Sequence, residues 1–224
     1  MEFVIEKQNY GQSAFSKTGL ALYDFCVLHV VCRYAWRCPN ERVLAAYREH
    51  ASNNHLDVGV GTGYFLDHAR FPTATPRIAL LDLNANCLER TARRIGRYSP
   101  EVYQANLLAP IDLKARKFDS IGMNYVLHCL PGGFPDKGRA IGHLAALLNP
   151  GGVLFGATLL QGGVARGPLA KTLMHLFNAR HTLNNTGDTH EGLTEALERH
   201  LTDVHIEIVG CVALFSGRAR RLAP

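Results

Sequence analysis

The feature that most constrains the fold of this chain is a cluster of three glycines between an apolar run and a helix-like pattern. Gly59, Gly61 and Gly63 occupy every second position of the stretch HLDVGVGTGYFLDHA, residues 55–69. Glycine loses more backbone entropy on folding than other residues and packs no side chain, so such a cluster indicates a local geometric requirement. The stretch predicts a strand, a tight turn and a helix, with the turn placed where a ligand could approach the main chain.

Segments with strand-like and helix-like patterns alternate through the rest of the chain. Residues 77–83, RIALLDL, are apolar on both faces, which is typical of a buried parallel strand. Other strands are expected at 56–60, 102–107, 118–127, 153–159, 204–209 and 212–216, and helices at 64–69, 84–95, 140–148, 169–178 and 191–201. This alternation predicts an α/β fold with a seven-stranded, mostly parallel, doubly wound sheet. Ligands of such sheets bind at the carboxyl ends of the strands.

The segment before the glycines is expected to be helical. Leu20, Tyr23, Val27 and Val30 recur at helical spacing, and Pro39 can open a second helix. We therefore predict an N-terminal helical cap over residues 1–50 and a ligand-binding core over residues 51–224. Two local signals in the core are also informative, because Asn84 is expected to cap a helix and residues 149–152, NPGG, are expected to stop one.

Composition excludes several classes of protein. The chain has 224 residues and a formal net charge of +5, without a basic stripe interleaved with aromatic residues, so nucleic acid is an unlikely partner. No window holds the ~18 apolar residues that span a bilayer, and the start of the chain lacks a signal-peptide layout. The six cysteines form no C-x-x-C pair and are expected to be buried or half-buried thiols. The eleven histidines show no H-E-x-x-H spacing, so we predict no metal site. We expect a soluble, cytoplasmic protein.

The first specific sign of a ligand is Asp82, which ends the second predicted strand. A carboxylate at this place can accept hydrogen bonds from both hydroxyls of a ribose, so Asp82 and the glycines together predict a nucleoside ligand. The alternative is that Asp82 caps a helix or is a surface acid. A dinucleotide fingerprint would need glycine at position 64, where this chain has Tyr64, and this disfavours a nicotinamide cofactor. Asp57 could fix the glycine turn by accepting backbone amides.

At this point the sequence resembles the class I S-adenosylmethionine-dependent methyltransferases, which have a Rossmann-like fold. Residues 57–63, DVGVGTG, are similar to the first motif of that family, and residues 80–83, LLDL, to its second. Residues 105–107, 118–124 and 148–153 resemble the later motifs, and the match runs from residue 55 to residue 160. The whole chain looks like small fungal and bacterial members that act in specialised metabolism. The pairs Tyr23-Asp24 and Trp36-Arg37 are similar to quinone-pathway methyltransferases.

The resemblance implies S-adenosylmethionine as methyl donor and S-adenosylhomocysteine as product. It also implies a set of donor-binding residues: Asp57, Gly59, Gly61, Thr62, Gly63, Asp82, Leu83, Asn106, Leu107, Asn124, Tyr23 and Trp36. Asn106 stands where many family members have aspartate. Its amide oxygen can still accept from the adenine amine, and the N–H of Leu107 can serve the ring nitrogen, so we expect weaker adenine selectivity. Arg33, Tyr34 and Arg37 are further candidates for closing the site.

The chemistry is expected at the end of the fourth strand, residues 124–129, NYVLHC. This segment lacks the N-P-P-[YF] pattern of enzymes that methylate amines of bases or glutamine. His128 is the candidate general base, although it could equally be a structural histidine that makes one hydrogen bond. Tyr125 is expected to serve packing rather than substrate contact.

The expected function is methyl transfer to an oxygen, nitrogen or carbon of a small molecule. Two alternatives stay open: a non-methylating cyclase that keeps the S-adenosylmethionine site, and, with less support, an RNA methyltransferase. The sequence does not define the acceptor or the oligomeric state.

Overall fold

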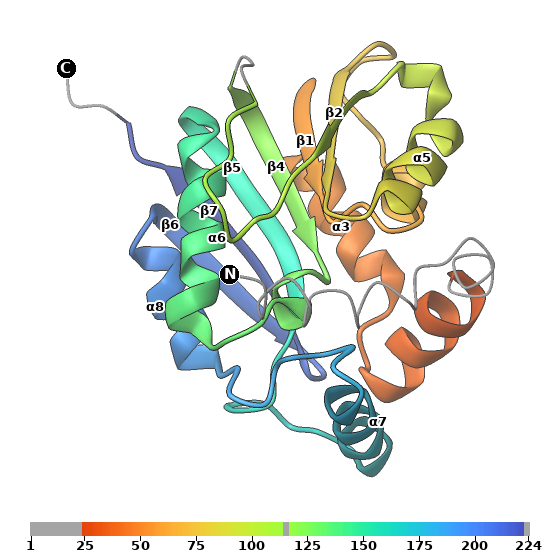
Figure 1. Cartoon of the computed structure of the whole chain (residues 1–224), viewed down its shortest axis with the longest axis vertical. Coiled ribbons are helices and arrows are strands. Elements are labelled where there is room, and N and C mark those ends of the chain that lie inside the picture. Colours follow the sequence, from red (N-terminus) through yellow and green to blue (C-terminus); the bar gives the residue numbers. More distant parts are fainter. Residues whose placement is uncertain (1–23, 114–116, 222–224) are drawn as a thin grey trace.

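The computed structural model describes residues 24–113 and 117–221, and the strands in these ranges form one sheet (Figure 1). The strand order is β3-β2-β1-β4-β5-β7-β6, in which β7 runs antiparallel to both β5 and β6 and the other pairs are parallel. The prediction of a seven-stranded, mostly parallel sheet is confirmed. The strands are β1 Asn54–Val58, β2 Arg77–Asp82, β3 Glu101–Gln104, β4 Phe118–Asn124, β5 Leu148–Leu159, β6 Leu201–Val209 and β7 Val212–Ala219.

Helices follow the strands as the sequence pattern predicts. Asn84 caps α5 by accepting a hydrogen bond from the N–H of Asn86 at 2.9 Å, and α3 begins directly after Pro39, so both predicted helix starts are confirmed. The helices are η2 Asp24–Ala35 (a π-helix), α3 Asn40–His50, α4 Tyr64–His68, α5 Ala85–Arg94, α6 Phe134–Ala146, α7 Pro168–Ala179 and α8 His190–Glu198, with short 3₁₀ turns η3 Gly96–Tyr98 and η4 Leu127–Cys129.

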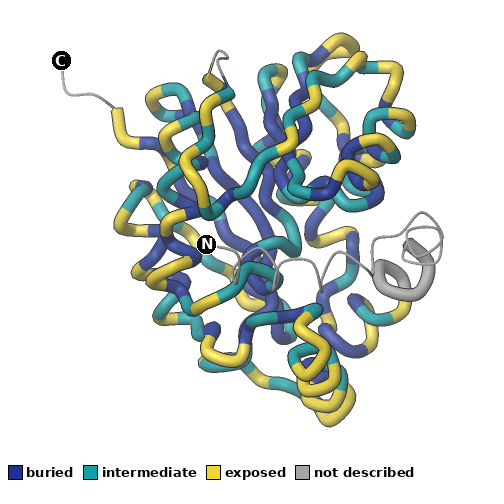
Figure 2. The backbone as a smooth tube through the Cα atoms, viewed as in Figure 1, coloured by how far each residue is buried: buried dark blue, intermediate teal, exposed yellow. Residues whose placement is uncertain are grey.

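The sheet is buried on both faces, which explains the continuous apolar runs of its inner strands. In β2, Ile78 and Leu80 belong to a buried cluster that includes residues of α3 and α5, whereas Ala79 and Leu81 belong to a second cluster that includes residues of α6 and α8. Figure 2 shows the buried central strands and the exposed outer surfaces of the helices. The doubly wound arrangement is therefore confirmed, and it directs the carboxyl ends of β1, β2, β3 and β4 toward one edge of the sheet.

Helix α3 belongs to the layer that covers the sheet. Tyr47 is fully buried, and its ring meets the ring of Phe155 in β5 edge-on at 5.1 Å. Of the residues that predicted the first helix, Leu20 and Tyr23 lie outside the described residues. A division into a cap and a core at residue 50 stays a prediction.

Several predicted boundaries are wrong, and three of them lie at the ends of strands. Helix α6 ends before residues 149–152, as predicted, but those residues belong to β5, next to a shift in its register with β4 between Phe118 and Ser120. Strand β4 ends at Asn124 because Tyr125 turns the chain with a φ of 59°. Residues 105–107 form a loop after β3 rather than its last part.

Within the described ranges, no helix combines the length and the apolar character that crossing a membrane requires.

Candidate functional site

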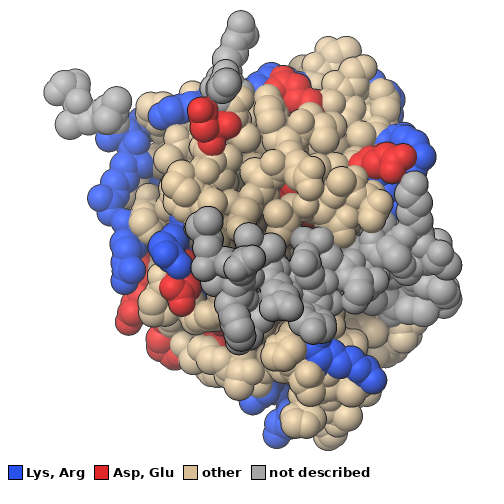
Figure 3. All heavy atoms as spheres, in the orientation of Figure 1, with Lys and Arg blue, Asp and Glu red and all other residues tan. Residues whose placement is uncertain are grey.

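A pocket opens where the carboxyl ends of β1, β2, β3 and β4 meet. One side is formed by residues 59–62, 81–84 and 105–107, and the other by residues 124–126 and 129–131 together with His181, Thr182 and Asn184. The sheet order changes direction between β1 and β4, and ligands of open α/β sheets bind at such a switch point. On the face shown in Figure 3, most of the surface is uncharged and charged side chains lie mainly at the margins.

The three glycines have different roles in the turn after β1. All three have positive φ values, 65° at Gly59, 54° at Gly61 and 75° at Gly63, a backbone region that favours glycine. A Cβ at Gly59 would collide with the side chain of Val126, and one at Gly63 would lie 2.9 Å from Cγ2 of Thr91. A Cβ at Gly61 would meet no described atom within 4 Å, and Gly61 lines the pocket. Gly59 and Gly63 therefore permit close packing, whereas Gly61 leaves space for a ligand.

Asp82 lies at the end of β2, beside the glycine turn. Its Oδ1 accepts a hydrogen bond from the N–H of Asn84 at 2.8 Å. Burial raises the pKa of its carboxyl to about 6, although backbone N–H groups of Asn84, Gly61, Val60 and Leu83 oppose this shift. The pocket wall thus holds a half-buried carboxylate, and the groups that stabilise its ionised form are backbone N–H donors.

Asn124, the last residue of β4, lines the pocket with a buried amide. The amide lies near the Tyr47 hydroxyl, but neither its Oδ1 nor its Nδ2 has a hydrogen-bond partner at suitable geometry among the described residues. Leaving such a group unsatisfied costs about 1–3 kcal/mol. An unsatisfied amide and an empty space beside Gly61 are what a polar ligand would fill.

Asp57 lies behind the pocket rather than in its wall. Its Oδ1 accepts a hydrogen bond from the Tyr47 hydroxyl at 2.5 Å and lies 3.6 Å from Nε2 of His55. Oδ1 of Asp57 thus carries a side-chain donor from α3 and connects α3 to β1. The expectation that the carboxylate also accepts backbone amides of the turn stays a prediction.

Leu83, Asn106 and Leu107 line the side of the pocket next to Asp82, and Thr62 lines it from the glycine turn. The Oδ1 of Asn106 accepts a hydrogen bond from the N–H of Leu108 at 2.9 Å, so it already has one donor within its own loop. Leu107 is held by its carbonyl, which accepts a hydrogen bond from Nδ1 of His143 at 2.9 Å.

The structure does not support His128 as the general base. His128 is 4% exposed and does not line the pocket. Its Nδ1 accepts a hydrogen bond from the N–H of Leu159 at 3.1 Å and lies 3.3 Å from Oγ1 of Thr158. Burial, with a smaller effect from the charge of Lys137, lowers the pKa of the imidazole to about 3. These contacts are those of a structural histidine, the alternative that the sequence left open.

The N-terminal candidates do not reach the pocket in the described part of the chain. Trp36 is buried in the core, and its carbonyl accepts a hydrogen bond from the N–H of Cys211 at 3.1 Å. Its indole is used in packing, which argues against its predicted role in donor binding. Arg33, Tyr34 and Arg37 are exposed and do not line the pocket, and Tyr23 lies outside the described residues.

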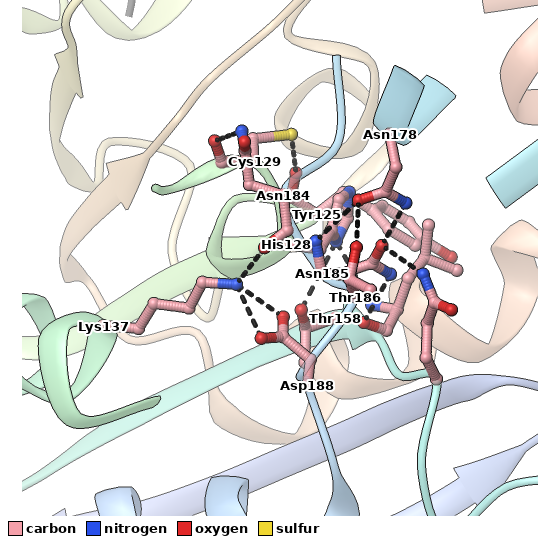
Figure 4. Close-up of polar contacts among 12 residues, drawn as sticks. Tyr125, His128, Cys129, Lys137, Thr158, Asn178, Asn184, Asn185, Thr186 and Asp188 are labelled. Carbon is pink, nitrogen blue, oxygen red and sulfur yellow. Dashed lines mark hydrogen bonds and ion pairs between the residues drawn. The ribbon is translucent and has the colours of Figure 1, made fainter. Parts of the chain in front are cut away.

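Sequence reasoning identified residues 124–129 of the opposite wall but missed the part of that wall in the loop between α7 and α8. This loop is held by a buried ion pair between Lys137 and Asp188 (Figure 4). Nζ of Lys137 lies 2.7 and 2.6 Å from the two carboxylate oxygens of Asp188 and donates to the carbonyl of Asn184 at 2.9 Å. The signal was weak, because a lysine and an aspartate 51 residues apart in an unremarkable context do not predict a contact.

Comparisons with known proteins agree with this geometry. The family described as "Methyltransferase domain" matches residues 56–154, the range that holds the glycine turn, Asp82 and Asn124. Demethylluteothin O-methyltransferase of Streptomyces thioluteus is 40% identical over 205 residues, which cover 92% of this chain and 89% of that protein. The chain belongs to the methyltransferase family. The resemblance seen in the sequence is thereby confirmed.

Other proteins of known structure share the fold of this methyltransferase. A DhpI–SAH complex superposes with a TM-score of 0.65 at 18% identity, covering 98% of each chain. The [4+2]-cyclase SpnF gives a TM-score of 0.65 at 17% identity, covering 96% of this chain and 97% of that one. Identities this low establish the fold alone, and both an SAH complex and a [4+2]-cyclase are found on it.

Proposed function

We propose that this methyltransferase binds S-adenosylmethionine in the pocket and transfers its methyl group to a hydroxyl of a small specialised metabolite. The observation that carries the proposal is the carboxylate of Asp82 beside the glycine turn, because it is placed to accept hydrogen bonds from two neighbouring hydroxyls. The matched family supports the reaction, and the name of the Streptomyces relative supports an oxygen acceptor.

The residues present fit the proposed donor. Asp82 would hold the ribose, Gly61 and Thr62 would contact the donor along the turn, and the loop at Asn106 and Leu107 would contact the adenine. The unsatisfied amide of Asn124 would gain a polar partner. When bound, S-adenosylmethionine supplies a methyl group on a positively charged sulfur, and the protein aligns the acceptor with it and excludes water.

The other wall of the pocket suits an uncharged acceptor. Of the described residues that line the pocket, none is lysine or arginine, and Asp82 is the sole carboxylate. The wall opposite Asp82 contains the side chains Tyr125, Cys129, Leu130, Pro131, Thr182 and Asn184. A largely neutral organic acceptor would leave no buried charge unpaired in such a wall.

The test is a turnover experiment with demethylluteothin as the probe acceptor. Purified protein, S-adenosylmethionine and the probe are expected to give S-adenosylhomocysteine and a product heavier by one methylene group. Formation of a rearranged product of unchanged mass, with no S-adenosylhomocysteine, would instead establish the cyclase alternative that the SpnF fold illustrates. Absence of both products would contradict the proposed acceptor class.

Filling the space beside Gly61 is expected to abolish donor binding. In Gly61→Val, the branched side chain would occupy the empty space of the turn and would also resist the backbone angle there. Calorimetry with S-adenosylhomocysteine should detect no binding. Gly151→Val is the matched control, since Gly151 also has a positive φ, 79°, but does not line the pocket, so the variant should lower the melting temperature and leave the affinity unchanged. Equal affinity in Gly61→Val and wild type would show that the glycine serves the turn alone.

Donor affinity is expected to depend on pH through Asp82. The raised pKa of about 6 means that the ligand-free carboxyl is protonated below that pH, whereas the ribose hydroxyls need the ionised form as acceptor. The affinity for S-adenosylhomocysteine should therefore rise about tenfold per unit up to about pH 6 and then level off. Calorimetry from pH 5 to 8 measures this, and Asp82→Asn should abolish the dependence. A flat profile in the wild type would contradict it.

Cytoplasmic location and the lack of a nucleic acid partner stay predictions from the sequence.

A further inference from the structure

We propose that His181 takes the proton from the acceptor hydroxyl during methyl transfer, in the role that the sequence assigned to His128. The inference rests on the proposed function and names one residue of the same pocket. His181 lies in the wall opposite the glycine turn, directly after α7. In Figure 1, α7 lies below the arrowhead of β4, where the acceptor is expected to meet the donor.

The backbone at His181 is the first argument. Helix α7 ends in a left-handed turn in which the N–H of His181 donates to the carbonyl of Asn178 at 3.0 Å and the N–H of Thr182 donates to that of Phe177 at 2.9 Å. His181 has a φ of 54°, and glycine is the usual residue at this place after a helix. A histidine at a position whose backbone favours glycine suggests that its imidazole has a function.

Two residues with a strained backbone line this pocket. Five non-glycine residues of the described ranges have positive φ, and two of them, Tyr125 and His181, line the same side of the pocket from different segments. Such positions persist where the surrounding structure imposes them, and they are frequent at active sites. Tyr125 follows β4, so the strained residues mark both the strand end and the wall that faces the acceptor.

The other ionisable groups of the pocket are poor proton acceptors. Asp82 is assigned to the ribose at the donor side. Burial raises the pKa of the Cys87 and Cys129 thiols to about 12 and raises that of the Tyr125 phenol well above its ordinary value, so all three keep their protons. Tyr64 stacks on His68 at 4.3 Å. An imidazole is the side chain that most readily accepts a proton near neutral pH, and His181 is the histidine in the described pocket wall.

The wall that carries His181 is fixed to the end of β4. Asn184 donates from its N–H to the carbonyl of His128 at 2.7 Å and from its Nδ2 to the carbonyl of Cys129 at 3.0 Å. Lys137 donates a hydrogen bond to the carbonyl of Asn184 and forms an ion pair with Asp188 (Figure 4). The loop is thus anchored at Asn184 and Asp188, which holds the nearby backbone of His181 beside the strand end. Precise placement is what proton transfer at a reacting group requires.

The step balances in atoms and charge. The acceptor oxygen forms a bond to the methyl carbon, the carbon–sulfur bond breaks, and its electron pair stays on sulfur. The hydroxyl proton moves to the imidazole of His181 and later to water. The positive charge that leaves the sulfur therefore appears on the imidazole, and no oxidant or further reactant is needed.

The test uses His181→Gly, because glycine suits the left-handed backbone and removes only the imidazole. With demethylluteothin and S-adenosylmethionine, we expect the single-turnover rate to fall about 10²–10⁴-fold. The melting temperature should stay equal or rise, and the affinity for S-adenosylhomocysteine should stay within about twofold. The wild-type rate should rise with pH through the titration of a histidine, this dependence should be lost in the variant, and added imidazole should restore part of the rate.

His175→Ala is the matched control, since His175 is an exposed histidine on α7 that does not line the pocket, and it should react like the wild type. A rate for His181→Gly within tenfold of wild type, with the pH profile retained, would overturn the role of His181 while leaving the proposed function intact. Wild-type protein that binds S-adenosylhomocysteine but does not methylate the probe would contradict the proposed acceptor class, and the role of His181 would fall with it.

Discussion

Asp82→Ala is expected to weaken the binding of S-adenosylhomocysteine by about 10²–10⁴-fold. In the proposed site, the variant would remove two charge-assisted hydrogen bonds to the ribose, each worth about 1.5–3 kcal/mol. The fold should survive, because the raised pKa of this carboxyl shows that its charge is unfavourable in the ligand-free pocket. Calorimetry measures the affinity, and the melting temperature of the ligand-free protein should stay equal or rise.

Asp119→Ala provides the control for this result. Asp119 is an exposed residue near the start of β4, at the opposite end of the strand from the pocket, and its loss should leave affinity unchanged. If Asp82→Ala binds within about twofold of the wild type, the ribose is held elsewhere and the site assignment is wrong.

Lys137→Met is expected to lower the melting temperature by roughly 6–20 °C. The substitution leaves the carboxylate of Asp188 buried without its cation, which costs about 3–5 kcal/mol, and each kcal/mol shifts the melting point of a domain this size by about 2–4 °C. Thermal denaturation followed by circular dichroism measures the change.

The double variant Lys137→Met/Asp188→Leu distinguishes two effects on stability. One is the cost of leaving a buried carboxylate unpaired, and the other is the net contribution of the ion pair. Replacing both charges with apolar side chains removes the stranded carboxylate, so most of the lost stability should return. The exposed pair of Arg139 and Asp136 on α6 is the control, because breaking it with Arg139→Met should change stability by less than about 1 kcal/mol. A single variant as stable as the wild type would mean that the buried pair does not hold the loop.

The sequence predicted the sheet, the cap of α5 and the glycine turn well, because local patterns determine them. The apolar run of β2 is buried on both faces, Asn84 caps α5, and the glycines lie at a turn whose angles favour glycine. Each of these signals acts over a few residues, so it can be recognised without knowledge of the rest of the fold.

The part of the opposite wall between α7 and α8 was not predicted, because it depends on contacts between distant segments. His128 and His181 are both histidines next to short turns, and no local pattern tells which one faces the pocket. The two histidines differ in their tertiary contacts. His128 is hydrogen-bonded to Leu159 and lies against Thr158 of β5, whereas His181 follows α7. The pairing of Lys137 with Asp188 likewise appears only when α6 and the loop before α8 come together.

Parts of the two walls of the pocket come from separate stretches of the gene. The glycine turn, Asp82 and the loop at Asn106 precede residue 110, whereas His181, Thr182 and Asn184 belong to the connection between β5 and β6. Mutations, insertions and exchanges in that connection alter the acceptor side without changing a residue that would hold the donor. After gene duplication, copies of such an enzyme are therefore free to diverge toward new acceptors while their dependence on one methyl donor is inherited unchanged.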